Sequence, residues 1–151
     1  MKQMKKAIHA ADFLNEPSEY GKSFSRGIRI TPNGGDFLFI SGTASVDNNG
    51  KTCNFGNFSA QARRTFDNLT ALIESEGASW HDVVQTRCYL KDMGDYDKFN
   101  EFRNGFYKVQ KLQPFPASVC IEANLCRSDL LIEVELIAVL GNFKKGRKKT
   151  K

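Results

Sequence analysis

Four side chains near the C-terminal end of the chain could carry out acid–base or nucleophilic chemistry: Cys120, Glu122, Glu133 and Glu135. Glu133 and Glu135 are two residues apart, so an extended strand places both carboxylates on one face of a sheet. Carboxylates crowded on one face hinder each other's ionisation, and a raised pKa suits a general acid. We therefore expect a polar face that a ligand or partner subunit helps to satisfy.

The strands that would carry this face show alternation with a period of two. Residues 117–123 and 130–140 are the two predicted strands, and in the first of them Ser118, Cys120 and Glu122 share one side. Because the helix-facing sides should be wholly apolar, we assign these three residues to the face of the carboxylate pair. The opposite face of the last strand, which we assign to the helices, holds Leu130, Ile132, Val134, Leu136, Ala138 and Leu140.

The carboxylate face also carries Leu131, Ile137 and Val139. A fully solvated face rarely holds three large aliphatic residues, and a closed core rarely holds several carboxylates. A subunit contact with a polar cleft at its edge accommodates both kinds of residue. A plain solvated sheet face is the simpler alternative.

The rest of the chain predicts one α+β domain over residues 21–141, preceded by an N-terminal extension over 1–20. Strands are expected at 24–30, 36–42 and 83–90, and a short further strand could follow Gly42. A helix is expected over 59–76, with Ser59 as its N-cap and Gly77 just beyond its end. A second helix, with Asp95 as its N-cap, carries a core-facing stripe of Phe99, Phe102, Phe106 and Val109.

Charge and composition exclude several classes of protein. Six of the 22 Lys and Arg residues lie in the last eight positions, so the net charge of +5 becomes −1 over residues 1–143. We expect residues 142–151 to be a disordered basic tail and do not expect a dedicated nucleic-acid-binding face. No apolar run is long enough to span a bilayer and no secretory segment is evident, which predicts a cytoplasmic protein. The spacing of four cysteines and two histidines predicts no metal site and no disulfide framework.

Several motifs together carry a family resemblance over residues 24–140: Ile40-Ser41-Gly42-Thr43, Gln61 with Asn68-Leu69, Gly77-Ala78-Ser79-Trp80-His81-Asp82-Val83-Val84, Tyr89-Leu90-Lys91-Asp92-Met93, Asn100, Pro116-Ala117-Ser118 and Leu131-Ile132-Glu133-Val134-Glu135-Leu136-Ile137-Ala138-Val139. They resemble the Rid (YjgF-like) family of small cytosolic proteins, also called L-PSP. The resemblance implies a chorismate-mutase-like fold of order β-β-β-α-β-α-β-β. It further implies a homotrimer whose sheets pack into a central barrel, with clefts between the subunits.

The best-known activity of this family is hydrolysis of reactive enamines and imines to 2-oxo acids and ammonia, without a cofactor. The resemblance implies Glu133 as the carboxylate that positions water, and Gly42 and Cys120 as further cleft positions. Glu122, which shares the predicted face with Cys120, is expected to line the same cleft. Ser118 stands where family members carry an arginine that grips the substrate carboxylate. Phe24 stands where they carry a tyrosine.

Loss of that arginine weakens the expectation of a deaminase, because serine cannot neutralise a small organic acid. Arg127 is the candidate replacement, whereas we interpret Arg26 as a surface residue. The elements Ser-Phe-Ser-Arg-Gly and Leu-Cys-Arg are also similar to the Rid-like half of chorismatases, which hydrolyse an enol ether. A non-catalytic ligand-binding protein and, with least support, RNA binding or cleavage through the tail are further alternatives.

Overall fold

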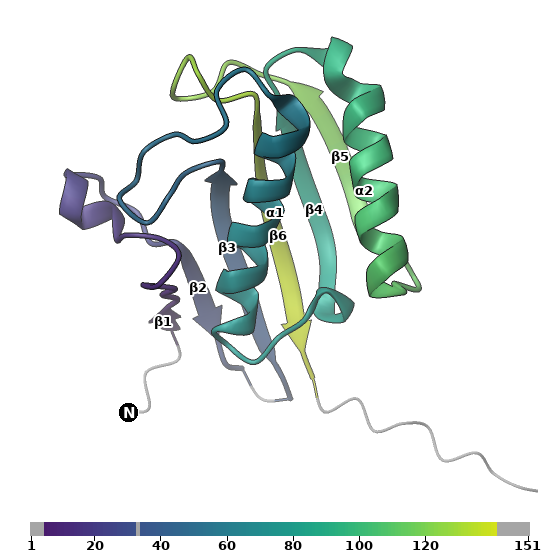
Figure 1. Ribbon diagram of the computed structural model, residues 1–151. Helices are drawn as coiled ribbons and strands as arrows, with labels where there is room; N and C mark the ends of the chain where they lie inside the picture. Colours follow the sequence, from purple (N-terminus) through teal and green to yellow (C-terminus); the bar gives the residue numbers. More distant parts are fainter. Residues whose placement is uncertain (1–4, 33, 142–151) are drawn as a thin grey trace, which may run out of the picture.

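The computed structural model describes residues 5–32 and 34–141, which form a six-stranded sheet with two long helices on one of its faces (Figure 1). The strands run in the spatial order β1-β2-β3-β6-β4-β5. All neighbouring pairs are antiparallel except β4 and β5, which are parallel. The elements in chain order are β1 (Lys5–Ala7), a 3-10 turn (Pro17–Tyr20), β2 (Gly27–Ile30), β3 (Asp36–Ala44), α1 (Phe58–Glu74), a 3-10 turn (Trp80–Asp82), β4 (Val83–Leu90), a 3-10 turn (Met93–Asp95), α2 (Tyr96–Gln110), β5 (Ala117–Glu122) and β6 (Ile132–Leu140).

The order of helices and strands confirms the predicted chorismate-mutase-like α+β fold, but its third N-terminal strand lies elsewhere. The short strand expected after Gly42 is replaced by the continuation of β3 to Ala44. The additional strand is β1, which pairs with β2 inside the segment expected to be an extension. Ile8 and Leu14 of that segment are fully buried, so residues 5–20 pack with the domain. The expected basic tail, 142–151, lies outside the described residues.

Helix α1 buries the apolar stripe that its sequence predicts. Its N-cap is Asn57, whose side chain accepts a hydrogen bond from the backbone N–H of Ala60, in place of the expected Ser59. Gly77 has a positive φ of 76°, as expected for a residue just beyond a helix C-terminus. The buried stripe, fully inaccessible to solvent, consists of Ala62, Phe66, Leu69, Leu72 and Ile73.

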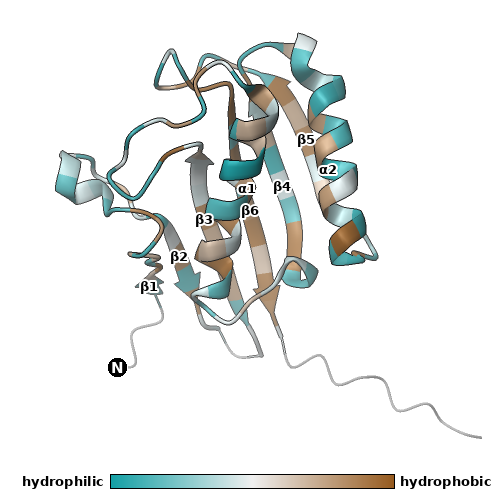
Figure 2. Ribbon diagram, in the orientation of Figure 1, coloured by the Kyte–Doolittle hydropathy of each residue, from teal (hydrophilic) through white to brown (hydrophobic). Residues whose placement is uncertain are grey.

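Helix α2 packs its aromatic residues against α1 and the loop before β4. The ring of Phe66 lies 5.2 Å from that of Trp80 and 5.1 Å from that of Phe102, and Trp80 lies 5.1 Å from Phe106. Val109, expected to continue this stripe, is 80% exposed, because the helix ends at Gln110 beyond the edge of the core. Figure 2 shows the resulting alternation of hydrophilic and hydrophobic bands along both helices.

The other face of the sheet has no helix over it and keeps large apolar side chains exposed. Phe39 on β3 and Val119 and Ile121 on β5 are each more than 40% exposed. On β6, Glu133, Glu135, Ile137 and Val139 lie on this open face, while Ile132, Val134, Leu136 and Ala138 are buried under the helices. This confirms the two faces predicted for the last strand. None of the helices among the described residues is long and apolar enough to cross a membrane.

The face predicted for β5 is wrong. In the parallel pairing of β4 with β5, Cys120 lies beside Cys88 and Ser118 beside Thr86, both of which are buried under the helices. Glu122 lies beside the equally buried Leu90. The polar residues of β5 therefore lie on the helix side, and Val119 and Ile121 share the open face with the two glutamates.

Candidate active site

A local irregularity of the sheet makes space for one carboxylate. Ile40 pairs with Leu136 and Thr43 with Val134, so Ser41 and Gly42 together lie opposite the single residue Glu135. This two-against-one arrangement is a β-bulge, a feature that commonly re-aims side chains next to active sites. A Cβ atom on Gly42 would lie 2.0 Å from Oε1 of Glu133. Only glycine at this position allows the Glu133 carboxylate to lie against the β3 backbone.

Glu133 is the unpaired carboxylate of the open face. Within the described residues its side chain makes no hydrogen bond or ion pair. Burial raises the pKa of the Glu133 carboxyl above its usual range, and the nearby charge of Glu135 raises it further. The group is therefore held closer to neutrality than an exposed glutamate, as a proton donor and acceptor requires.

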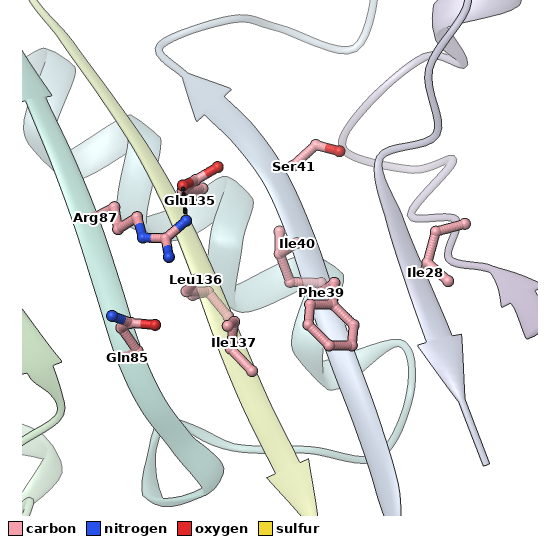
Figure 3. Close-up of a pocket in the computed structure, with 9 residues that line it drawn as sticks. All are labelled: Ile28, Phe39, Ile40, Ser41, Gln85, Arg87, Glu135, Leu136 and Ile137. Carbon is pink, nitrogen blue, oxygen red and sulfur yellow. Dashed lines mark hydrogen bonds and ion pairs between the residues drawn. The ribbon is translucent and has the colours of Figure 1, made fainter. Parts of the chain in front are cut away.

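Glu135, two residues further on, is in the opposite situation. Its Oε1 accepts hydrogen bonds from Nη1 of Arg87 and from the hydroxyl of Tyr89, each at 3.1 Å. Burial, together with the hydrogen bond to Glu135, raises the pKa of Tyr89, so the phenol stays protonated and keeps donating. Figure 3 shows Arg87 reaching across from β4 to Glu135, beside a shallow cavity of about 250 Å³ on the open face.

A larger cavity, of about 680 Å³, lies where the bulge, the N-terminal segment and the loop before β6 meet. Four of the residues selected from sequence line it: Phe24, Gly42, Arg127 and Glu133. Glu135 lines it as well. The further residues around it include Tyr20, Lys22, Arg26, Ser41 and Cys126. One wall therefore carries the carboxylates, and another carries cationic and aromatic side chains.

Arg26 is not the surface residue that the sequence suggested. It is only 5% exposed, with its guanidinium carbon 5.9 Å from the ring centres of both Tyr20 and Phe24. Nε donates to the backbone oxygen of Asn15 at 3.0 Å, and Nη2 donates to Oδ1 of the same residue at 3.1 Å. Asn15 and Tyr20 of the N-terminal segment contact the arginine, and the packing of this segment contributes to its burial.

Arg127 lies in the loop before β6, as expected, and lines the cavity. Its Nη1 donates to the backbone oxygen of Gly50 at 2.7 Å and to Oγ1 of Thr52 at 3.4 Å. These contacts attach the loop before β6 to the turn that follows β3. The arginine is thereby held at the edge of the cavity.

Ser118, Cys120 and Glu122 lie outside this cavity. Oγ of Ser118 accepts a hydrogen bond from Nη1 of Arg103 at 3.2 Å, which brings a guanidinium from α2 to the edge strand. Glu122 accepts a hydrogen bond from the backbone N–H of Met93 at 2.9 Å. Cys120 packs against the core, and burial raises its pKa, so its thiol is not activated. Within one chain, none of the three shares a face with Glu133.

Sequence reasoning missed Tyr20, Lys22, Arg87 and Tyr89 as lining or supporting residues. Arg87 and Tyr89 alternate with buried residues along the strand expected over 83–90, so the period of two there contained a signal that was not used. Tyr20 and Lys22 lie in a segment without periodicity and offered none. Among the described residues, no group of three or more His, Cys, Asp or Glu side chains is arranged to hold a metal ion.

The fold and the cavity together define a small α+β domain with a one-sided sheet and a pocket lined by side chains of both charges. A family model described as Endoribonuclease L-PSP matches residues 15–140. The chain therefore belongs to this family, the Rid or YjgF-like family that its motifs resemble.

Relatives and solved structures agree with this assignment. A RutC family protein of Pyrococcus horikoshii is 35% identical over 124 residues, covering 82% of this chain and 91% of the relative. A protein of Escherichia coli K12 named 2-iminobutanoate/2-iminopropanoate deaminase is 34% identical over 106 residues, covering 70% and 80%. The crystal structure of the YjgF gene product of E. coli superposes with a TM-score of 0.74 at 27% identity, covering 89% of this chain and 98% of that one.

Proposed function

We propose that this protein is a cytoplasmic hydrolase that converts a reactive enamine or imine to a carbonyl compound and ammonia, without a cofactor. The observation that carries the proposal is Glu133, an unpaired, partly buried carboxyl with a raised pKa, in a cavity next to a bulge. The similarity to a protein named as an iminobutanoate and iminopropanoate deaminase supports this reaction class.

In this mechanism Glu133 exchanges protons with the substrate twice. As water adds to the C=N carbon, the carboxylic acid donates a proton to the nitrogen and recovers one from the water, which forms a carbinolamine. The same exchange then protonates the amine and removes the hydroxyl proton while the C–N bond breaks and ammonia leaves. An enamine is first protonated on carbon by the same acid, which then recovers a proton from the nitrogen of the resulting iminium and so gives the imine. The charge of Glu135, whose carboxylate is bound by Arg87 and Tyr89, adds to the effect of burial in raising the pKa of Glu133 and so favours its protonated form.

We further propose a homotrimer in which the open, apolar faces pack together. The exposed Phe39, Val119 and Ile121 support this packing, since exposed apolar patches mark interaction surfaces. In such an assembly Ser118, Cys120 and Glu122, on the edge strand, could complete a Glu133 cavity only in a neighbouring copy. Light scattering that finds a stable monomer at working concentration would contradict the intersubunit cleft.

Turnover of 2-aminoacrylate, generated by an amino-acid lyase in the same cuvette, tests the reaction. We expect 2-oxo acid and ammonia to appear faster than in buffer, and Glu133→Gln to lower kcat/KM by about 10² to 10⁴, the usual contribution of a general acid–base group. Glu101→Gln, which removes an exposed carboxylate from α2, is the matched control and should retain full activity. Absence of acceleration by the folded wild type, with a working deaminase as positive control, would refute the proposal.

A second candidate function is hydrolysis of an enol ether, because a carboxylic acid with a raised pKa also suits protonation of a vinyl carbon. The cavity volume of about 680 Å³ could hold a substrate larger than a four-carbon imino acid. Release of pyruvate from an enolpyruvyl ether, lost in Glu133→Gln, would favour this reaction over imine hydrolysis.

A further inference from the structure

Two guanidinium groups, those of Arg26 and Arg127, line the cavity. Within residues 5–32 and 34–141, neither Arg26 nor Arg127 forms a salt bridge. The only carboxylate among the described groups that affect the pKa of Arg26 is Glu16, which binds the imidazole of His9 at 2.8 Å and not the guanidinium. Buried charges in proteins are normally paired, so the buried Arg26, with the half-buried Arg127 at the same cavity, is a feature to be explained.

The guanidinium of Arg26 is held in one orientation, but not all of its N–H donors have an acceptor among the described residues. Asn15 occupies two of its nitrogens, Nε and Nη2, and Nη1 has no acceptor in the described part of the chain. The guanidinium carbon lies 5.9 Å from the ring centres of both Tyr20 and Phe24, and the residue is only 5% exposed, so aromatic contact favours one orientation of a largely desolvated group. A preorganised, desolvated guanidinium is the group best suited to bind a carboxylate.

Arg127 adds a second positive charge close to the first. Both guanidinium groups line the same cavity. Burial is the main cause that lowers the pKa of Arg26, and the charge of Arg127 contributes a smaller lowering against the opposing effects of Tyr20 and Glu16. Nη1 of Arg127 is held by Gly50 and Thr52, while its other nitrogens have no described partner. A bound anion would offset both positive charges and supply the missing acceptors.

We propose that Arg26 and Arg127 together bind the carboxylate of the substrate, so that the substrate is a small organic acid oriented with its reactive carbon toward Glu133. This inference rests on the proposed function of the same cavity. It places the anion grip on the segment after the first 3-10 turn and on the loop before β6, and not on the edge strand at Ser118. The carboxylate of Glu135 on the opposite wall disfavours the reverse orientation, which makes the binding mode directional.

The two arginines could instead be structural, with Arg26 tying down Asn15 and Arg127 tying down Gly50. Calorimetric titration separates the two roles. The probes are 2-oxobutanoate, an unreactive acid of the right class, and its neutral analogue 2-oxobutanamide. Both are titrated into the full-length protein carrying Glu133→Gln, where no turnover can contribute.

We expect the acid to bind and the amide to bind at least about tenfold more weakly, since a charge-assisted hydrogen bond contributes that much or more. Arg127→Gln should weaken binding of the acid by about tenfold to a hundredfold and reduce the preference over the amide. Arg26→Lys, which keeps the charge but loses the planar fork, should also weaken it. Arg63→Gln, which removes an exposed arginine of α1 that does not line this cavity, should not.

Equal binding of acid and amide, or unchanged affinity in folded Arg127→Gln and Arg26→Lys, would overturn the inference. If Arg26→Lys fails to fold, Arg127→Gln decides by itself. Anion binding that depends on the arginines, in a protein that hydrolyses no imine, would leave the grip standing and remove the proposed reaction. Imine hydrolysis with an unchanged KM in both arginine variants would support the proposed reaction and overturn the assignment of the two arginines as the anion-binding groups.

Discussion

The bulge region around Glu133 and the edge strand β5 were expected to form one site, yet they are built in different ways. The bulge is supported by fully buried amides of α1. Asn68 donates to the backbone oxygens of Ala44 and Val46, and Gln61 binds the backbone of Asp129 and Leu131. The edge strand is attached through exposed contacts such as Arg103 with Ser118. The comparison teaches that Glu133, the carboxylate with a raised pKa, lies where the buried side chains of Gln61 and Asn68 anchor the backbone of β3 and of the loop before β6.

The largest effect expected from a change away from the reacting groups is at Gly42. Because an alanine Cβ would lie 2.0 Å from Oε1 of Glu133, Gly42→Ala must displace that carboxylate. A displacement of about 1 Å can lower activity about 10²-fold. We expect kcat/KM for 2-aminoacrylate to fall by that order, measured by 2-oxo acid release. Gly105→Ala is the matched control, since nothing lies within 4 Å of its added Cβ, and α2 should gain about 0.5–1 kcal/mol. Equal activity of the two variants would contradict the role of the bulge.

Loss of the buried support should cost stability. Gln61→Ala removes three hydrogen bonds, to the backbone of Asn54, Asp129 and Leu131. Backbone groups left unsatisfied cost about 1–3 kcal/mol each, so we expect the free energy of unfolding to fall by about 2–4 kcal/mol. Urea denaturation measures this. Asp67→Ala, on the exposed side of the same helix, should change it by no more than about 0.5 kcal/mol.

The titration of Glu133 provides a pH test of the same region. Folding raises the pKa of this carboxyl, so the folded state favours the protonated form of Glu133. The stability that this form contributes is complete below the ordinary glutamate pKa of about 4.3 and is lost as the pH rises through the raised, folded-state value. Relative to Glu133→Gln, the wild type should therefore lose stability as the pH rises from about 4 through that window. Urea denaturation at several pH values measures the difference, and parallel profiles for the two proteins would contradict it.

The smallest effect is expected at the edge strand. Ser118→Ala removes the hydrogen bonds with Arg103 and Thr86, and because Ser118 is exposed the expected loss is only about 0.5–1 kcal/mol of unfolding free energy. Ser118→Thr keeps the hydroxyl and should be close to the wild type. A loss as large as that of Gln61→Ala would show that β5 is as rigidly held as the bulge.

Much of the fold was predictable from local pattern. The apolar stripe of α1 and the alternation of β6 predict burial correctly, because each arises from the repeat of a single regular element. Val109 was misassigned because periodicity does not indicate where the core ends. Arg26 was misassigned because its burial depends on residues 15–20, which have no periodic pattern of their own.

The sequence by itself determined the family, the order of helices and strands, and the phase of alternation within β6, including the shared face of Glu133 and Glu135. Only the tertiary structure decided which face of β5 meets the helices. Alternation with a period of two sorts the residues of a strand into two sets, but it does not say which set faces inward. The orientation of β5 comes from its parallel pairing with β4. The structure likewise brought Arg26 and Arg127 to one cavity, because contacts between residues a hundred positions apart have no counterpart in local pattern.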